Sequence, residues 1–303
     1  MEDIIMKKIT MMIAIVLFVF SLSACGSKGT NPHTLTYEID NIHDVVLSYD
    51  DEDITFFESP DDTLIIKEYM TDADSKYYAK VDIDQGYIHV SEGGKPLFGS
   101  FSRHIEVYFP KTYTGSLTVT STNGNVDFSE VDIEVTSLRI DCSSGKVRIR
   151  NAYADTINLS STSGTLDIGH LEGKEVYIST TSGKVVCDEI SGNVTYVSTS
   201  GDIEIESAVG AGSYKAENSG ILDITYTDVA GNLYLYNKNG DVEVTLPEDL
   251  SFRFEAVTKN GSVSTPFESV LSMKNDTVMG TVGGNPSITV KTETKNGNIK
   301  VEQ

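Results

Sequence analysis

The segment Leu117–Val126, which reads LTVTSTNGNV, is the clearest copy of a phrase that recurs along the chain. Each copy holds alternating apolar residues, then Ser or Asn, then Gly, then a second alternating apolar pair. Self-similarity at a period near twenty residues predicts a repeat protein, in which each unit buries its apolar face against its neighbours. The expected turn glycines are Gly124, Gly145, Gly164, Gly183, Gly201, Gly220, Gly240, Gly261 and Gly297.

The apolar positions of each unit follow strand periodicity. Around Gly145, Leu138 and Ile140 stand before the turn, and Val147 and Ile149 stand after it. A spacing of two places such side chains on one face of a strand, with the polar residues between them on the other face. The sequence therefore predicts an all-β protein with an inner apolar column on each side of every turn.

Two architectures satisfy this pattern. A single-stack β-solenoid, or β-helix, would use 19–21 residues per coil, as two short strands and a corner that pair in parallel with the next coil. An antiparallel β-hairpin repeat would close each Ser-Gly or Asn-Gly as a two-residue turn. Type I′ hairpin turns need positive φ at both residues, which Ser does not favour, and Ser precedes five of the nine glycines. The turn chemistry and the constant spacing favour the solenoid.

The first residues predict an export signal. Lys7 and Lys8 precede an apolar run over 9–20, and the run ends in Leu-Ser-Ala before Cys25. The run is too short for a permanent membrane span, and its charged, apolar and small-residue regions have the order of a leader. We expect residues 1–24 to be a lipoprotein signal peptide, Cys25 to carry the lipid, and 25–32 to be a tether. The alternative is an ordinary cleaved signal with an incidental cysteine.

The remaining chain divides into a cap and a stack. Residues 33–116 lack the twenty-residue spacing but contain strand-like segments, which predicts an N-terminal β cap over the exposed end of a solenoid. Residues 117–303 are the expected solenoid domain. The glycine spacing widens between Gly261 and Gly297, so we expect an irregular insertion at 265–287.

Charge and cysteine content limit the partners. The net charge of −22 disfavours nucleic acid and holds the body away from anionic surfaces. Cys142 and Cys187 occupy different positions in their units, so no disulfide between them is expected. Cys187 falls in an apolar column, which predicts a small core residue.

Two stretches carry a resemblance to a known family. The segment VYFPK at 107–111, followed by LTVTSTNGNV at 117–126, and the later LPE at 246–248 with AVTKNG at 256–261, resemble the bacterial putative-adhesin family of unknown function, a DUF4097-like group of β-strand-repeat proteins. The likeness covers about residues 45–301. It implies a β-repeat fold, adhesion by analogy with the family name, and envelope-stress control by analogy with some relatives. It implies no catalytic or binding residues.

Motifs for catalysis are missing from the sequence. It has no G-x-S-x-G, H-E-x-x-H, paired C-x-x-C or Walker phrase, and its five histidines are scattered. We therefore expect a non-catalytic, outward-facing membrane lipoprotein that binds a cell-envelope glycan or a surface protein, without a cofactor. Two alternatives stay open: a carbohydrate-active solenoid lyase or hydrolase, and a structural or envelope-stress-sensing accessory protein.

Outward-facing acids follow the turns. Asp127, Arg148 and Asp167 should form a charge-compensated ladder across three coils. The later members of the column should form an uncompensated acidic row, which is either a solvated face or a Ca²⁺ site. This row consists of Glu204, Asp223 and Glu243.

Tyrosines gather before the later turns. Tyr177, Tyr234 and Tyr236 fall at outward positions, where rings with hydroxyl groups suit sugar stacking or a protein partner. The alternative is that they are only good strand formers on an exposed sheet. Tyr214 shares the column, but its register is doubtful and it could point inward. We expect the acidic row to lie near these tyrosines and so to favour a neutral or cationic ligand.

Overall fold

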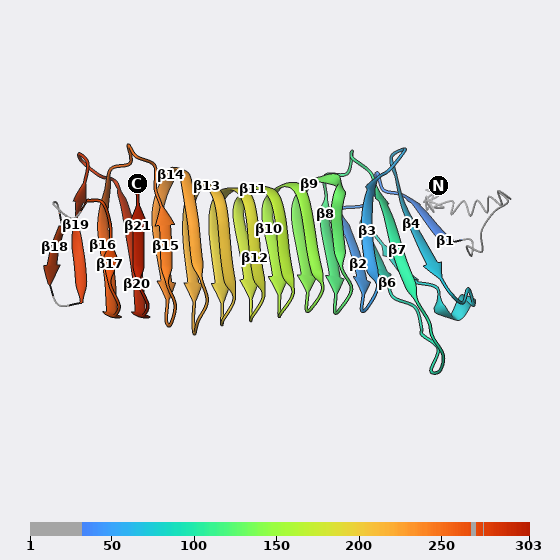
Figure 1. The fold of residues 1–303 in the computed structure, drawn as a ribbon. Coiled ribbons are helices and arrows are strands. Elements are labelled where there is room, and N and C mark those ends of the chain that lie inside the picture. The colour runs from blue at the N-terminus through green and yellow to red at the C-terminus, as the bar shows by residue number, and fades with distance from the viewer. Residues whose placement is uncertain (1–31, 268–270, 275) are drawn as a thin grey trace, which may run out of the picture.

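A computed structural model describes residues 32–267, 271–274 and 276–303. The expected signal peptide, Cys25 and the tether as far as Asn31 lie outside these residues, so they stay predictions. Figure 1 shows a long stack of strands lying side by side. The described chain contains one short 3₁₀ helix, η1 (Ser75–Tyr77), and otherwise strands and loops. No helix in this part of the chain is long and apolar enough to cross a membrane.

Six long strands form the middle of the stack, and each bends once along its length. Each pairs in parallel with the next, so the β-solenoid is confirmed and the hairpin alternative is wrong. The two halves of each strand are the two expected short strands of a coil, and the Ser-Gly or Asn-Gly turn joins one coil to the next. The strands are β9 (Val126–Cys142), β10 (Lys146–Ser161), β11 (Thr165–Thr180), β12 (Lys184–Ser198), β13 (Asp202–Ala216) and β14 (Leu222–Asn237).

The predicted apolar columns form the core. Ile168, Cys187, Ile205 and Ile224 are aligned on successive strands, and all are buried. Cys187 is therefore the core residue that its position predicted, and both it and Cys142 are buried free thiols. The polar residues between the core positions face out, as the alternation required.

The turn glycines are needed because successive backbones approach closely. A Cβ on Gly145 would lie 2.1 Å from the carbonyl oxygen of Gly124, and a Cβ on Gly164 would lie 2.1 Å from that of Gly145. Among the nine turn glycines only Gly220 has a positive φ, at 141°. Crowding between coils, rather than the turn dihedral, selects glycine at this column.

At the N-terminal end, the coil formed by β2 and β3 lies between two coils that come later in the chain. β2 pairs in parallel with both β6 and β8, while β3 pairs in parallel with β7 and β9. The parallel stack thus extends into the region expected to be a cap, and antiparallel β1, β4 and β5 close it (Figure 1). The strands are β1 (His33–Glu38), β2 (Asp44–Tyr49), β3 (Asp53–Glu58), β4 (Thr63–Met70), β5 (Lys80–Asp84), β6 (Tyr87–Ser91), β7 (Arg103–Phe109) and β8 (Ser116–Ser121).

The C-terminal end repeats this arrangement. β20 lies between β14 and β16, and β21 lies between β15 and β17, although both follow all of these in the chain. The expected irregular insertion contains β18 and β19, an antiparallel pair that continues the sheet from β16. The strands are β15 (Val242–Thr245), β16 (Phe252–Asn260), β17 (Val263–Ser264), β18 (Leu271–Lys274), β19 (Thr277–Val282), β20 (Ile288–Asn296) and β21 (Ile299–Glu302).

Candidate functional site

Tyr234 and Tyr236 lie together on the outer side of β14, in its second half. Tyr234 is aligned between Ser213 of β13 and Lys291 of β20. Tyr236 is aligned in the same way between Lys215 and Glu293. Both side chains are half-buried by these neighbours. We call this pair the tyrosine face, and the out-of-order strand β20 forms one of its borders.

Tyr177 does not belong to this pair. It is 42% exposed on β11, and Thr195 and Ser213 occupy the two strands between it and Tyr234 in the same row. Three strand spacings of about 4.8 Å place the two backbones roughly 14 Å apart. Tyr214 points inward, as its doubtful register suggested: it is fully buried and its hydroxyl lies 2.9 Å from that of Tyr226.

The charges beside the tyrosine face are paired. Lys291 Nζ lies 2.9 Å from Glu255 Oε1, and Lys215 Nζ lies 2.7 Å from Glu217 Oε1. The hydrogen bond to Glu217 raises the pKa of Lys215, and burial raises the pKa of Tyr234. The lysines are therefore charged and the phenol is neutral at physiological pH, which leaves an aromatic surface bordered by groups that can hydrogen-bond to hydroxyls.

The acidic row is not as we expected. Glu204, Asp223 and Glu243 are aligned on adjacent strands, but Lys184 lies 3.4 Å from Glu204, and Lys300 forms an ion pair with Glu243. The row is thus compensated at both ends. Burial, followed by the charges of Glu243 and Glu204, raises the pKa of Asp223 in the middle.

The row also lies on the opposite face from the tyrosines. Its members are in the first half of each coil, and Tyr234 and Tyr236 are in the second half. The two halves face each other through buried residues, so their outer sides point away from each other. The acidic row therefore gives no reason to prefer a neutral or cationic ligand at the tyrosine face, and that part of the expectation was wrong.

The earlier ladder has the predicted geometry. Arg148 lies 3.3 Å from Asp127 and 3.8 Å from Asp167. Across the described residues, no group of three or more His, Cys, Asp or Glu side chains is arranged to hold a metal ion, and this includes the acidic row. The geometry gives the Ca²⁺ alternative no support.

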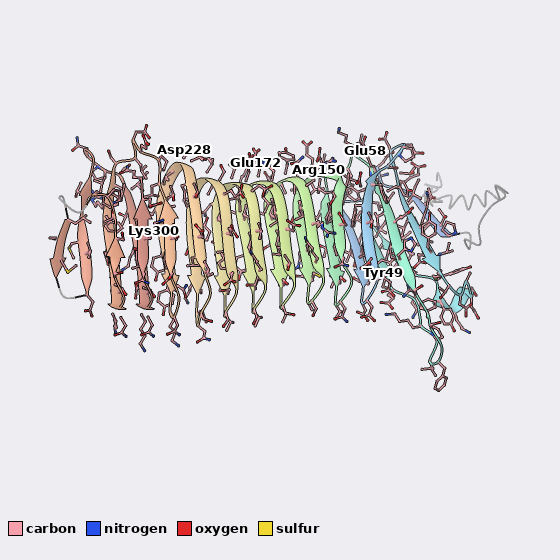
Figure 2. The ribbon with its side chains drawn as sticks, in the orientation of Figure 1. Tyr49, Glu58, Arg150, Glu172, Asp228 and Lys300 are labelled. Carbon is pink, nitrogen blue, oxygen red and sulfur yellow. The ribbon has the colours of Figure 1, made fainter. Side chains whose placement is uncertain are left out.

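Two shallow hollows lie away from the tyrosine face. One, of about 380 Å³, is lined at the bends by residues that include Tyr153, Glu172 and Lys174. Figure 2 shows Arg150, Glu172 and Asp228 along this same edge of the stack. The other, of about 770 Å³, is lined near the N-terminal end by residues that include His43 and Tyr113.

Comparison with known proteins identifies the family. The model of the Toastrack DUF4097 family matches residues 42–302, which is most of the chain. The chain belongs to the Toastrack DUF4097 family. This confirms the resemblance seen in the sequence, and the long parallel stack is the fold of this Toastrack chain.

Solved structures with some likeness to this Toastrack chain carry adhesin or lipid-binding descriptions. A "putative adhesin" from Bacteroides fragilis is 13% identical, with 91% of this chain and 98% of that chain covered and a TM-score of 0.41. A "putative adhesin" from Parabacteroides distasonis is 10% identical, with 90% and 98% covered and a TM-score of 0.43. A "putative lipid binding protein" from the same species is 14% identical, with 90% and 98% covered and a TM-score of 0.40. No curated protein matches the chain.

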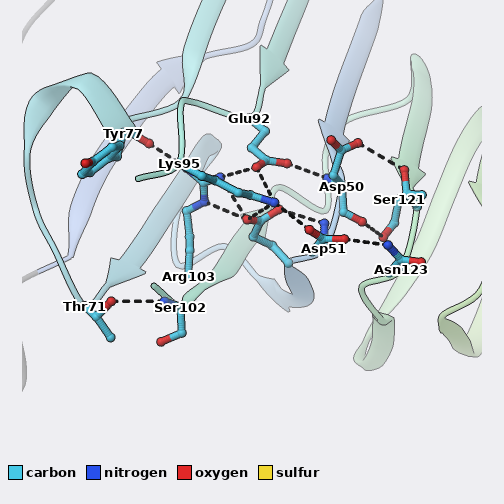
Figure 3. Close-up of polar contacts among 12 residues, drawn as sticks. Asp50, Asp51, Thr71, Tyr77, Glu92, Lys95, Ser102, Arg103, Ser121 and Asn123 are labelled. Atoms are coloured by element: carbon cyan, nitrogen blue, oxygen red, sulfur yellow. Dashed lines mark hydrogen bonds and ion pairs between the residues drawn. The ribbon is translucent and has the colours of Figure 1, made fainter. Parts of the chain in front are cut away.

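Sequence reasoning missed a charged cluster at the N-terminal end of the Toastrack fold. The Arg103 guanidinium is fully buried and lies 3.0 Å from Glu52 and 2.8 Å from Glu92. Lys95 lies 2.8 Å from Glu92 and 2.9 Å from Asp51 (Figure 3). Burial raises the pKa of Glu92. For Glu52, burial acts in the same direction, but a hydrogen bond with Glu92 and the charge of Arg103 outweigh it and lower the pKa. We call Glu52, Glu92, Lys95 and Arg103 the end cluster.

The second missed feature is the segment between β6 and β7. Leu97 and Phe98 are each 91% exposed, more than any other large apolar side chain in the described chain. A signal was present in the sequence, because residues 93–105 contain no Asp or Glu in a chain of net charge −22. The end cluster had no comparable signal, since Glu52 and Arg103 are 51 residues apart.

Proposed function

We propose that this Toastrack chain is a lipid-anchored protein on the outer side of the cell membrane, which binds an envelope glycan through Tyr234 and Tyr236 without catalysing a reaction. The position of these two half-buried tyrosines side by side on the outer side of β14 is the observation that carries the proposal. A phenol ring offers a flat apolar surface and a hydroxyl, which together suit the faces and edges of sugar rings.

The surroundings of the pair support an extended ligand. The tyrosines lie on the outer side of a continuous parallel sheet, so a polymer chain could cross several strands without entering a cavity. Lys215, Lys291 and Glu293 border the rings and supply both donors and acceptors. This combination favours hydroxyl-rich ligands over apolar ones, and it requires no group poised for bond cleavage.

The anchor rests on the leader sequence and on Cys25, which follows Leu-Ser-Ala. A diacylglyceryl group on the Cys25 sulfur, with or without a third acyl chain on its amine, would give stable membrane attachment, because each buried methylene contributes about 0.8 kcal/mol. Cell fractionation of Cys25→Ala tests this. We expect a soluble, secreted or unprocessed product; equal membrane retention of both proteins, with no lipid label on either, would contradict the anchor.

The binding site is tested by the double variant Tyr234→Ser/Tyr236→Ser. Co-sedimentation with isolated cell-envelope polysaccharide should fall at least tenfold, while the unfolding midpoint in urea stays close to that of the parent. Tyr177→Ser is the matched control, because it removes an equally outward tyrosine outside the pair, and it should bind like the parent. Unchanged binding by the double variant would show that the tyrosine face is not the site. Binding to a protease-treated but not to a polysaccharide-digested envelope would identify a glycan, and the reverse would identify a surface protein.

A further inference from the structure

The segment 93–102, here called the Phe98 loop, projects from the N-terminal end of the stack. Figure 1 shows the connection from β6 to β7 extending beyond the edge formed by the turns. Its outer residues Leu97 and Phe98 are adjacent in the chain and almost fully exposed. Exposing two large apolar side chains to water costs free energy, so such a pair on a well-ordered fold calls for an explanation.

The base of the Phe98 loop is firmly held. On one side, a Cβ at Gly93 would lie 2.1 Å from the carbonyl oxygen of Tyr78, so the backbone is packed against η1. On the other side, Arg103 Nη1 donates a hydrogen bond of 2.6 Å to the carbonyl of Tyr77, and the backbones of Ser102 and Thr71 are joined at 3.1 Å. Figure 3 shows these contacts of Arg103, Ser102 and Lys95 at the base of the loop. The apolar pair is therefore carried on a base that is held on both sides.

The loop differs in charge from the rest of the molecule. Lys95 and Arg103 at its base are paired with acids of the end cluster, and residues 96–102 between them carry no charged side chain, whereas the whole chain has a net charge of −22. An acidic body is repelled by an anionic lipid surface, but this loop is not. An uncharged segment with exposed apolar side chains can partition into the boundary between lipid headgroups and acyl chains, where burial of apolar area drives binding.

We propose that the Phe98 loop inserts Leu97 and Phe98 into the lipid bilayer and thereby fixes the orientation of the solenoid on the membrane. The inference rests on the proposed membrane anchor. β1, where the described chain begins, lies at the same end of the stack as the loop (Figure 1). Seven residue-to-residue steps join Cys25 to Pro32, and at 3.3–3.6 Å per step they span at most about 25 Å. A lipid on Cys25 therefore keeps this end close to the bilayer, which favours lipid over a protein groove as the occupant.

The chain contains no tryptophan, so a single introduced indole reports its own environment. We would compare the whole lipid-modified chain carrying Phe98→Trp with the chain carrying Met273→Trp, since Met273 is 77% exposed on β18 at the opposite end. Both would be reconstituted into phosphatidylcholine vesicles with brominated acyl chains, which quench tryptophan by contact. The proposal expects at least twofold quenching of the indole at 98 and none at 273.

Each other outcome has a defined meaning. A vesicle-bound chain whose indole at 98 is unquenched overturns the insertion and leaves the anchor intact. Equal quenching at 98 and 273 also overturns it, because the molecule would then lie on the membrane without a preferred contact.

If the chain does not stay on vesicles, the anchor has failed. Insertion is then tested by titrating the Phe98→Trp chain with vesicles of brominated lipid. Saturable quenching of the indole at 98 that is lost in the Leu97→Ser/Phe98→Trp double variant supports insertion. No quenching at any lipid concentration contradicts it. Shielding of the indole at 98 from a water-soluble quencher in cells, without contact to brominated lipid, would assign the loop to a protein groove instead.

Discussion

The middle of the stack and its two ends are built from the same kind of coil but are connected differently. From β9 to β14, each strand pairs with the strand that follows it in the chain. At the ends, neighbouring turns come from distant segments: Asn123 bonds Asp51 across 72 residues, and Asn296 bonds Asn239 across 57. A repeat can therefore extend the middle, whereas each end requires the chain to return and insert a coil between two others.

This difference bears on function. The tyrosine face lies where β14 meets the inserted strand β20, and the Phe98 loop extends from the coil stacked on the inserted pair β2 and β3. The Phe98 loop therefore belongs to the N-terminal end, and the tyrosine face lies on the last strand of the middle, where it borders the C-terminal end. At both places the repeat is broken, and side chains can depart from its pattern. In these two proposals, the regular strands of the middle set the distance between the membrane contact and the glycan contact.

The largest effect should come from breaking the end cluster. Arg103→Ala leaves the buried Glu52 and the partly buried Glu92 beside each other without their guanidinium, and should lower the free energy of unfolding by about 3–5 kcal/mol. Arg150→Ala is the control, because its ion pair with Asp132 is half-exposed, and it should cost at most about 1 kcal/mol. Urea unfolding measures both. Equal costs would mean that the N-terminal end is not held by the cluster.

A core truncation in the middle should come next. Ile205→Ala removes a buried side chain between Cys187 and Ile224 and should cost about 2–5 kcal/mol, because the stacked strands cannot collapse into the cavity. Its outward neighbour Glu204→Ala should change the free energy of unfolding by less than about 1 kcal/mol. Similar losses in the two variants would refute the assigned register.

A smaller effect is expected at the C-terminal insertion. A Cβ on Gly297 would lie 2.1 Å from the carbonyl oxygen of Gly240, so Gly297→Ala should push the inserted coil away and cost about 1–3 kcal/mol. Gly284→Ala is the matched control, since nothing lies within 4 Å of its added Cβ. Amide hydrogen exchange should show the loss of protection concentrated in β20 and β21. A uniform loss along the stack would contradict this local role.

The smallest effect should be a gain from relieving the acidic row. Because the folded-state pKa of Asp223 is raised, ionising this group costs stability as the pH rises through that pKa. Asp223→Asn should therefore stabilise the protein by about 0.5 kcal/mol at pH 7. The gain should vanish below the unfolded-state pKa of 3.8, where the carboxyl is protonated in both states. Thermal melts at the two pH values test the sign, and a gain that persists at low pH would exclude charge repulsion as the cause.

The sequence predicted the core residues of the middle well, because equal spacing of the repeats determines which residues of successive coils are aligned. The alternation around each glycine identified Ile168, Ile205 and Ile224 as core residues, and the same count raised the doubt that placed Tyr214 inside. It could not predict the order of coils at the ends, since a turn at Gly297 has the same local sequence whether it follows Gly261 or stacks on Gly240 in space. The acidic row and the tyrosine face lie on opposite sides because the acids follow each turn and the tyrosines precede it, and the count from the glycines already contained this difference.

Cross-linking of introduced cysteines tests the inserted coil most directly. Positions 243 and 300 are aligned on adjacent strands β15 and β21, whereas 264 lies one strand farther, on β17. With strands about 4.8 Å apart, a bifunctional thiol reagent of roughly 5 Å should join Glu243→Cys/Lys300→Cys rapidly and Glu243→Cys/Ser264→Cys poorly. The account predicts at least a tenfold difference in rate in favour of the 243–300 pair. Faster joining of 243 to 264 would show that the coils stack in chain order, and would remove β20 from the border of the tyrosine face.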